Sequence, residues 1–249
     1  MKKVEFCGHV LTEGKRMPAP GKLMALQKWE LPPVVTMLRG FLGACNYYSA
    51  YVKDYARLAG PLYTKLKLNR EDGKKGSKKP LEWTPPEVEA FHALKDALIK
   101  ELKLFHVKPD QPFMLKTDAS GYAIGAVLEH EHEGKLVPVA FFSRVLTESQ
   151  HNWSPREIET YAIIAALRKY AGWIGYQPVI LLTDHKALEY WVKEFVDTPS
   201  GPAGRRARWH ETLSKFDITV QYVTSWQMPC PDMATLHPRH SKIALGMVV

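Results

Sequence analysis

The chain has 249 residues, a hydrophobic fraction of 45% and a formal net charge of +8, which indicate a folded basic protein of one large or two smaller domains. Its three cysteines lack paired spacing, which argues against a disulfide framework or a thiolate zinc site. They fit an intracellular protein, in either the cytoplasm or the nucleus. No stretch approaches the roughly 18 apolar residues of a membrane span, so no membrane partner is expected. The positive charge permits a nucleic-acid partner without identifying one.

The first part of the chain is predicted to be largely helical. An extended segment at 4–11 precedes apolar residues at helical spacing between 22 and 66. We therefore expect residues 1–70 to form a small helical region. It offers no acid cluster and no nucleophile–base pair, so a chain that begins near Lys79 is expected to keep any catalytic turnover.

A charged, glycine-containing segment, LNREDGKKGSKKP, follows the helical region and has no apolar periodicity. It predicts a solvated linker at 71–84. Its lysines fit contacts with phosphate or a flexible hydrophilic loop, and the second interpretation is the commoner one for a charge run. An amphipathic helix at 85–102 then opens a domain predicted to span 85–240, before a tail at 241–249.

From residue 112 onward, strand and helix patterns alternate. Strands are predicted at 113–118, 122–129, 136–143, 179–183 and 218–223, and helices at 155–173, 186–192 and 205–215. This order describes an α/β domain with a mixed five-stranded sheet, two hairpins and a right-handed crossover. The polar run EHEHE, residues 129–133, is expected at an exposed hairpin tip.

Two predicted strands end in the same pair of residues, Thr-Asp. The segment FMLKTDAS contains Asp118, and the segment VILLTDHK contains Asp184. Ligands of α/β proteins collect where strands end. Glu159 shares a helix face with apolar residues that must pack on the sheet, so it is expected either to meet a cation or to reach water at the helix edge. Glu157 is expected to be solvated on another face.

A fourth acid, Asp232 in MPCPDMATL, is placed to cap a final short helix, which is compatible with a second role. Four acids without a thiolate or histidine cluster favour hard cations such as Mg²⁺ or Mn²⁺. Because two such ions support phosphodiester cleavage, metal-dependent phosphoryl transfer is the hypothesis. The run RRARWH, residues 205–210, fits either phosphate binding or a helix face with Trp209 in the core.

The motifs resemble, in order, the thumb or connection region and the ribonuclease H domain of Ty3/gypsy-type long-terminal-repeat retrotransposon reverse transcriptases. The resemblance covers about residues 4–239. It rests on the segments FCGHVLTEGK, LRGFLGACNYYSAYV, LEWTPPEVEAFHALKDAL, FMLKTDASGYAIGAVL, ETYAIIAAL and VILLTDHKALEYW. The ending YVTSWQMPCPDMATLHPR departs from the family pattern, so the loop before Asp232 is expected to differ in shape.

The resemblance implies a ribonuclease H fold preceded by a small helical thumb- or connection-like unit, and an RNA–DNA hybrid as substrate. Four acids are expected to be catalytic and to hold two Mg²⁺ or Mn²⁺ ions: Asp118, Glu159, Asp184 and Asp232. Four basic residues are expected to contact the nucleic acid: Arg144, His185, Arg205 and Arg208. No Tyr-x-Asp-Asp polymerase signature occurs in the sequence, so no polymerase activity is expected from this chain.

The resulting hypothesis is a metal-dependent endonuclease that cleaves the RNA strand of hybrids. The alternative is a domesticated, non-enzymatic subunit of a larger assembly with protein partners, because a fold does not guarantee its usual activity. The four retained acids argue against that alternative. A third interpretation is a nucleic-acid-binding module that uses the helical region and the linker without cutting.

Overall fold

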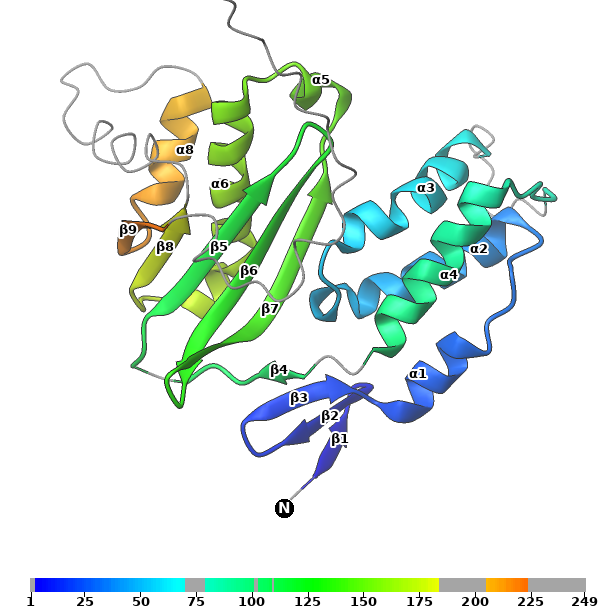
Figure 1. Ribbon diagram of the computed structural model, residues 1–249, viewed down its shortest axis with the longest axis horizontal. Coiled ribbons are helices and arrows are strands. Elements are labelled where there is room, and N and C mark those ends of the chain that lie inside the picture. Colours follow the sequence, from blue (N-terminus) through cyan, green and yellow to red (C-terminus); the bar gives the residue numbers. More distant parts are fainter. Residues whose placement is uncertain (1–2, 70–78, 101–102, 109, 184–204, 224–249) are drawn as a thin grey trace, which may run out of the picture.

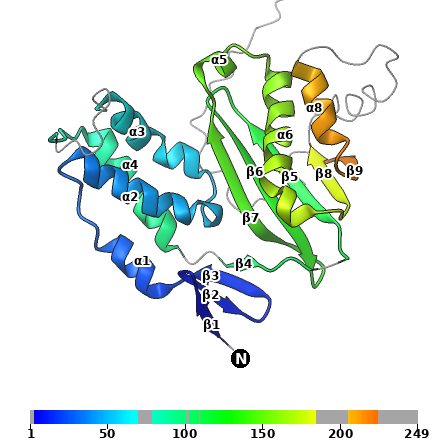
Figure 2. The same ribbon diagram turned by 180° about the vertical axis from the view of Figure 1, so that it is seen from behind.

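A computed structural model describes residues 3–69, 79–100, 103–108, 110–183 and 205–223 of the chain. Figure 1 and Figure 2 show three parts: a small sheet formed mainly by the N-terminal strands, a group of helices, and a larger sheet with helices on one face. Among the described residues, no helix is both long enough and apolar enough to cross a membrane.

The small sheet replaces the single extended segment predicted at 4–11. Its antiparallel strands, in spatial order, are β1 (Val4–Phe6), β2 (His9–Thr12), β3 (Lys15–Pro18) and β4 (Leu104–Phe105). Two-residue turns join the first three strands. Gly8 and Gly14 occupy these turns with φ of +73° and +76°, values that favour glycine. The short β4 arrives from far along the chain and ties the small sheet to the region that follows the helices.

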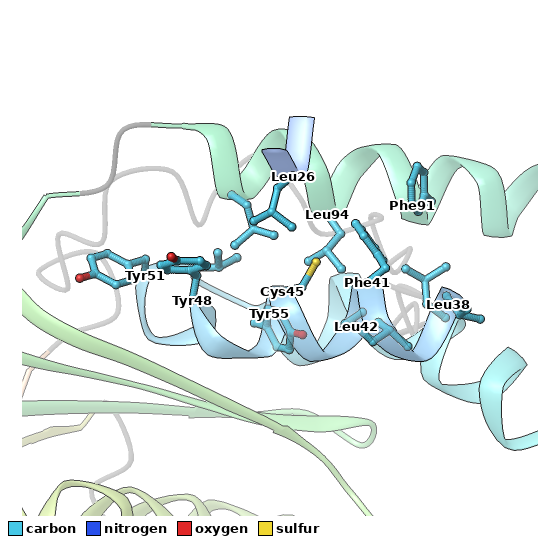
Figure 3. Close-up of a cluster of buried hydrophobic side chains, with 14 of the residues drawn as sticks. Leu26, Leu38, Phe41, Leu42, Cys45, Tyr48, Tyr51, Tyr55, Phe91 and Leu94 are labelled. Carbon is cyan, nitrogen blue, oxygen red and sulfur yellow. The ribbon is translucent and has the colours of Figure 1, made fainter. Parts of the chain in front are cut away.

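The predicted helical region is confirmed. Its elements are α1 (Pro20–Gln27), α2 (Val35–Tyr47), the 3₁₀ turn η1 (Ser49–Tyr51), α3 (Tyr55–Leu68) and α4 (Pro85–Ile99). Figure 3 shows the shared core, in which Phe41 and Cys45 of α2 face Phe91 and Leu94 of α4. Burial raises the pKa of the Cys45 thiol to about 12, so this cysteine acts as an apolar core residue.

Helix α4 belongs to this helical core, a position that the sequence pattern did not predict. The Phe91 ring lies 4.6 Å from the Phe41 ring, measured between centroids. At its first turn, Glu87 forms a 2.7 Å ion pair with the buried Lys65 of α3. We therefore propose that the division between the two units of the chain falls after Ile99 and not at the charged linker.

The larger sheet has the predicted mixed, five-stranded form. Its elements in chain order are β5 (Phe113–Ala119), β6 (Ala123–His132), β7 (Lys135–Val145), α5 (Glu148–His151), α6 (Pro155–Ile174), β8 (Val179–Thr183), α8 (Arg205–Leu213) and β9 (Ile218–Tyr222). The spatial order is β7-β6-β5-β8-β9, with antiparallel pairs from β7 to β5 and parallel pairs from β5 to β9. The helices predicted at 186–192 and near Asp232 lie outside the described residues.

Helix α6 covers one face of this sheet. Ile163, Leu167 and Tyr170 of the helix are buried with Phe113 and Leu115 of β5 in one apolar cluster. The helix begins with Ser154 as its N-cap and Pro155 at its first position, both favourable helix-start signals. This packing fixes where each α6 residue lies along the strands, and therefore which α6 residues lie beside the strand ends.

The interpretation of EHEHE as wholly exposed is wrong for its first two residues. Glu129 and His130 are buried, and the hairpin tip lies at Glu133–Gly134. Glu129 forms a 2.7 Å ion pair with Lys116 of β5, and both side chains are less than a tenth exposed. The strand extends past the predicted end, which brings these residues inside the protein.

His130 gives the fold a predicted pH dependence. Burial against Phe113, whose ring centroid lies 4.1 Å away, lowers the pKa of His130 from its ordinary 6.5, and the charge of Lys108 adds to this. Below about pH 6.5 His130 is protonated in the unfolded chain and stays neutral in the folded chain. The free energy of unfolding should therefore fall as the pH is lowered. Above that pH His130 is neutral in both states and no longer lowers the free energy of unfolding.

Denaturation by urea between pH 5 and 7.5 measures this effect. His130→Leu should reduce the pH dependence and leave the part that comes from His9, whose pKa is also lowered, by burial and then by Arg16. The same substitution at the exposed His92 is the matched control. An identical slope for His130→Leu and the parent protein would refute the assignment to His130.

Candidate active site

The carboxyl ends of β5 and β8 lie at one edge of the sheet. The two strands are parallel and neighbouring, and Lys116 pairs with Leu182 in their register. Helix α6 returns from β7 to β8 and must therefore begin at this same edge (Figure 1). Helix α8 precedes the parallel strand β9 and begins there too. We call this the carboxyl edge, and it is where ligands collect in α/β sheets.

Asp118 lies at the carboxyl edge as predicted. It is the penultimate residue of β5, is exposed and pairs with Gly125 of β6. By strand alternation it belongs with Lys116 to the set opposite the one that packs on α6. The neighbouring Ala119 packs with the first half of α6. The side chain of Asp118 is therefore open to solvent at the end of a rigid strand.

The turn after Asp118 is tightly hydrogen-bonded. The Ser120 hydroxyl accepts hydrogen bonds from the backbone N–H groups of Tyr122 and Ala123, at 3.3 and 3.0 Å. The imidazole Nδ1 of His151 on α5 lies 2.7 Å from the carbonyl oxygen of Gly121. These contacts, which the sequence pattern did not predict, fix the loop that follows the catalytic candidate.

Glu159 also lies at the carboxyl edge, in the second turn of α6. Its side chain is half-buried, and one of its carboxylate oxygens is fully buried. The preceding Ile158 packs in the same cluster as Ala119. This half-buried position is compatible with both predicted alternatives, a cation ligand and an acid at the edge of the helix. Glu159 and Asp118 share the edge but approach it from different faces of the sheet.

Glu157 has a structural role that differs from the predicted solvated one. Its carboxylate accepts hydrogen bonds from the backbone N–H and the hydroxyl of Ser154, both at 3.0 Å. The Ser154 hydroxyl in turn accepts from the N–H of Glu157 at 3.3 Å. This capping box fixes the first turn of α6, one turn ahead of the stretch that carries Glu159.

Two of the predicted basic residues are described at the carboxyl edge. Arg144, near the end of β7, is exposed and donates a 3.1 Å hydrogen bond to the hydroxyl of Tyr161 on α6. Arg208 is exposed on α8. The next residue, Trp209, is buried, and its ring lies 5.8 Å from that of Trp153 just before α6. The predicted helix face with Trp209 in the core is thus confirmed, and phosphate binding by the exposed Arg208 stays a prediction.

The positions of the remaining predicted site residues are not described by the structure. Asp184, His185 and Asp232 lie outside the described residues, and of Arg205 only the backbone, at the start of α8, is described. Among the described residues, no group of three or more His, Cys, Asp or Glu side chains could hold a metal ion. Asp118 and Glu159 are thus placed at the carboxyl edge, and the metal-ligand role of all four acids stays a prediction.

The family of the chain follows from comparison with known proteins. Residues 108–216 match the RNase H-like domain found in reverse transcriptase. The Pol polyprotein of transposon gypsy from Drosophila melanogaster is 34% identical over 88% of this chain. The chain is a Ty3/gypsy retrotransposon Pol homologue. It spans about a fifth of these relatives' length: 21% of the gypsy polyprotein and 17% of the 30% identical polyprotein of transposon 412 from the same species.

The fold of this Pol homologue is also found in solved structures. The foamy viral protease-reverse transcriptase in complex with RNA/DNA hybrid aligns with a TM-score of 0.74 over 99% of this chain and 32% of that one, at 19% identity. The same enzyme in complex with dsDNA aligns with a TM-score of 0.72 over 90% of this chain and 45% of that one, at 20% identity. The predicted ribonuclease H fold, preceded by a small helical unit, is confirmed, and the small sheet before that unit was not predicted.

Proposed function

We propose that the chain is a metal-dependent endonuclease that cleaves the RNA strand of RNA–DNA hybrids. The observation that carries the proposal is that Asp118 and Glu159 both lie at the carboxyl edge of an RNase H-like sheet. Asp118 comes from a strand and Glu159 from a helix. Two separate elements thus bring an acid to the same edge, which chance explains poorly. The alignment with a reverse transcriptase in complex with RNA/DNA hybrid supports the choice of substrate.

The donor set suits Mg²⁺ or Mn²⁺, the hard cations that prefer carboxylate oxygen. Asp118 offers an exposed carboxylate, and Glu159 offers a half-buried one. Asp184 and Asp232 would complete the ligand set. Two such ions, when bound, supply an activated water and neutralise charge on the departing oxygen.

The chain's own residues would hold and align the substrate. Arg144 and Arg208 face solvent at the carboxyl edge and suit contacts with backbone phosphates. Arg144 is oriented by its hydrogen bond to Tyr161, which restricts the guanidinium to one side of the edge. Arg205 and His185 are proposed as further contacts. Restriction of cleavage to RNA would require contacts with 2′-hydroxyl groups in a wide minor groove.

A nuclease assay tests the proposal directly. With Mg²⁺, the full chain should cut the RNA strand of a hybrid, and should leave duplex RNA and duplex DNA intact. Asp118→Asn should abolish cutting, whereas Asp217→Asn, an exposed acid at the opposite end of the sheet, should not change it. Tight hybrid binding without cutting would favour a domesticated, non-enzymatic role instead.

A further inference from the structure

A cleft of about 500 Å³ lies where the helical unit meets the RNase H-like sheet. One wall comes mainly from α3, with residues of α2 and η1, and the other from β7, with Tyr122 of the turn before β6 and Lys169 of α6. In Figure 1 and Figure 2, α3 lies beside β7, the last strand in the sheet order. Among the described strands β7 pairs only with β6, so the cleft lies along the edge of the sheet.

The cleft is built into the junction between the two units. The backbone N–H of Ala56 on α3 donates a 2.8 Å hydrogen bond to the hydroxyl of Ser143 on β7. Gly60 leaves no room for a Cβ atom beside the hydroxyl of Tyr122 on the sheet side. A Cβ at position 60 would require the Tyr122 hydroxyl, at the far end of its side chain, to shift. The two walls of the cleft therefore approach each other closely at Ser143 and at Tyr122.

Positive charge dominates the lining. Lys67, Arg144 and Lys169 line the cleft, and none of its described lining residues is acidic. Lys67 lies 3.7 Å from Glu148, but both side chains are more than four-fifths exposed, so this ion pair is weak and leaves Lys67 available. The lining therefore complements an anion.

Two aromatic rings offer a second kind of contact. Tyr63 of α3 is 40% exposed and Tyr122 is 43% exposed, and both line the cleft. Exposed aromatic faces next to cations are typical of sites for unpaired nucleotides, because each base can stack on a ring while phosphates meet the cations. The side chains of Asn46, Ser49 and Thr64 add hydrogen-bonding groups.

The size of the cleft selects among nucleic acids. Its volume lies within the roughly 300–1,000 Å³ of pockets that enclose ligands of drug size, a scale that suits a mononucleotide or dinucleotide and excludes a duplex. Tyr122 also lies in the hydrogen-bonded turn that follows Asp118. A strand in the cleft would therefore lie next to the carboxyl edge.

From these features we propose that the cleft between α3 and β7 binds a short unpaired segment of a nucleic-acid strand. Lys67, Arg144 and Lys169 hold its phosphates, and Tyr63 and Tyr122 stack on its bases. The inference goes beyond the proposed function, because it concerns a single strand and requires neither metal nor cleavage. A strand end that leaves the hybrid would have a place on the protein beside the catalytic candidates.

The test measures binding of a fluorescein-labelled thymidine tetranucleotide to the full chain by fluorescence anisotropy. EDTA is present to remove metal ions, and an abasic strand of equal length is measured for comparison. The intact strand should bind more tightly than the abasic one. Tyr63→Ala should weaken intact-strand binding roughly five- to a hundredfold and remove this preference, and Lys67→Glu should weaken both strands about tenfold. Arg144 is left unchanged because the proposed hybrid contacts also use it.

Matched controls are Lys135→Glu at the hairpin and Tyr176→Ala at the end of α6, both exposed and distant from the cleft. Neither should weaken binding beyond a small effect of net charge. Equal weakening by Lys67→Glu and Lys135→Glu, or equal affinity of the parent protein for both strands, would overturn the proposal. Because no metal is present, a chain that fails to cut hybrids can still bind the single strand. A chain that cuts hybrids can likewise fail to bind it, so the two proposals fail separately.

Discussion

Glu159→Gln is expected to slow cleavage of an RNA–DNA hybrid by roughly a hundredfold or more, while leaving the metal-free protein at least as stable as the parent. The expected fall in the cleavage rate follows from a loss of several kcal/mol of transition-state stabilisation, since each ~1.4 kcal/mol corresponds to a factor of ten in rate. The stability result follows from charge, because the substitution removes one negative group from an edge that already carries Asp118.

Added Mg²⁺ should separate the two proteins further. A cation that binds the folded state stabilises it in proportion to the logarithm of its concentration over the dissociation constant. If Glu159 is a ligand, the variant should lose part of that stabilisation. If it were an ordinary helix-edge acid, its replacement would change stability by less than about 0.5 kcal/mol under both conditions.

The measurement is thermal unfolding with and without Mg²⁺, together with hybrid cleavage. Glu131→Gln is the charge-matched control, because Glu131 is exposed near the hairpin end of β6, far from the carboxyl edge. Glu157→Gln is a poorer control, since Glu157 caps α6 through Ser154. Indistinguishable behaviour of Glu159→Gln and Glu131→Gln would remove Glu159 from the site and weaken the case for an active enzyme.

The fold and the positions of Asp118 and Glu159 at the carboxyl edge could be predicted because their signals are local. The short apolar runs at 113–115 and 179–182, before Asp118 and Asp184, indicate buried strands. The periodicity from Ser154 onward indicates a crossover helix in which Glu159 shares a face with apolar residues. Strand order and the common carboxyl edge then follow from the handedness of crossovers. The structure places Asp118 and Glu159 accordingly.

The partner of an amphipathic helix is not encoded in its own periodicity, and α4 shows the consequence. Its apolar stripe identifies a buried face, but packing on the sheet and packing on α2 give the same pattern. The structure selects α2, with Leu94 and Leu98 buried in the helical core. A chain that begins near Lys79 would leave this stripe uncovered, so its retained turnover is no longer the expected result. The turn glycines Gly8 and Gly14 were a readable signal for the small sheet that was missed.

Burial of polar residues in a strand is equally hard to predict, and the pair of Lys116 and Glu129 is the main example. Alternating Glu and His residues suggest an exposed hairpin, because charged side chains are rarely buried unless they are paired. The partner, Lys116, lies 13 positions earlier in the sequence and on another strand. Only the register between β5 and β6 brings their charges to 2.7 Å.

Lys116→Met should lower the free energy of unfolding by about 3–5 kcal/mol, because it leaves the carboxylate of Glu129 buried without its counter-charge. For a chain of this size, that loss corresponds to a fall in melting temperature of roughly 6–20 °C. The buried pair itself is not a source of great stability, since both groups lose hydration on folding. The double variant Lys116→Met/Glu129→Met should therefore recover most of the loss.

Urea denaturation of the two single variants and the double variant gives the coupling between these residues. Lys215→Met is the matched control, because Lys215 forms an i,i+4 ion pair with Glu211 on the surface, where solvent screens the charges and the change should be small. A double variant as unstable as the sum of its singles would show that the residues act independently. Since Lys116 is two positions before Asp118 on the same face of β5, the single variant should also loosen the strand that presents the first catalytic candidate.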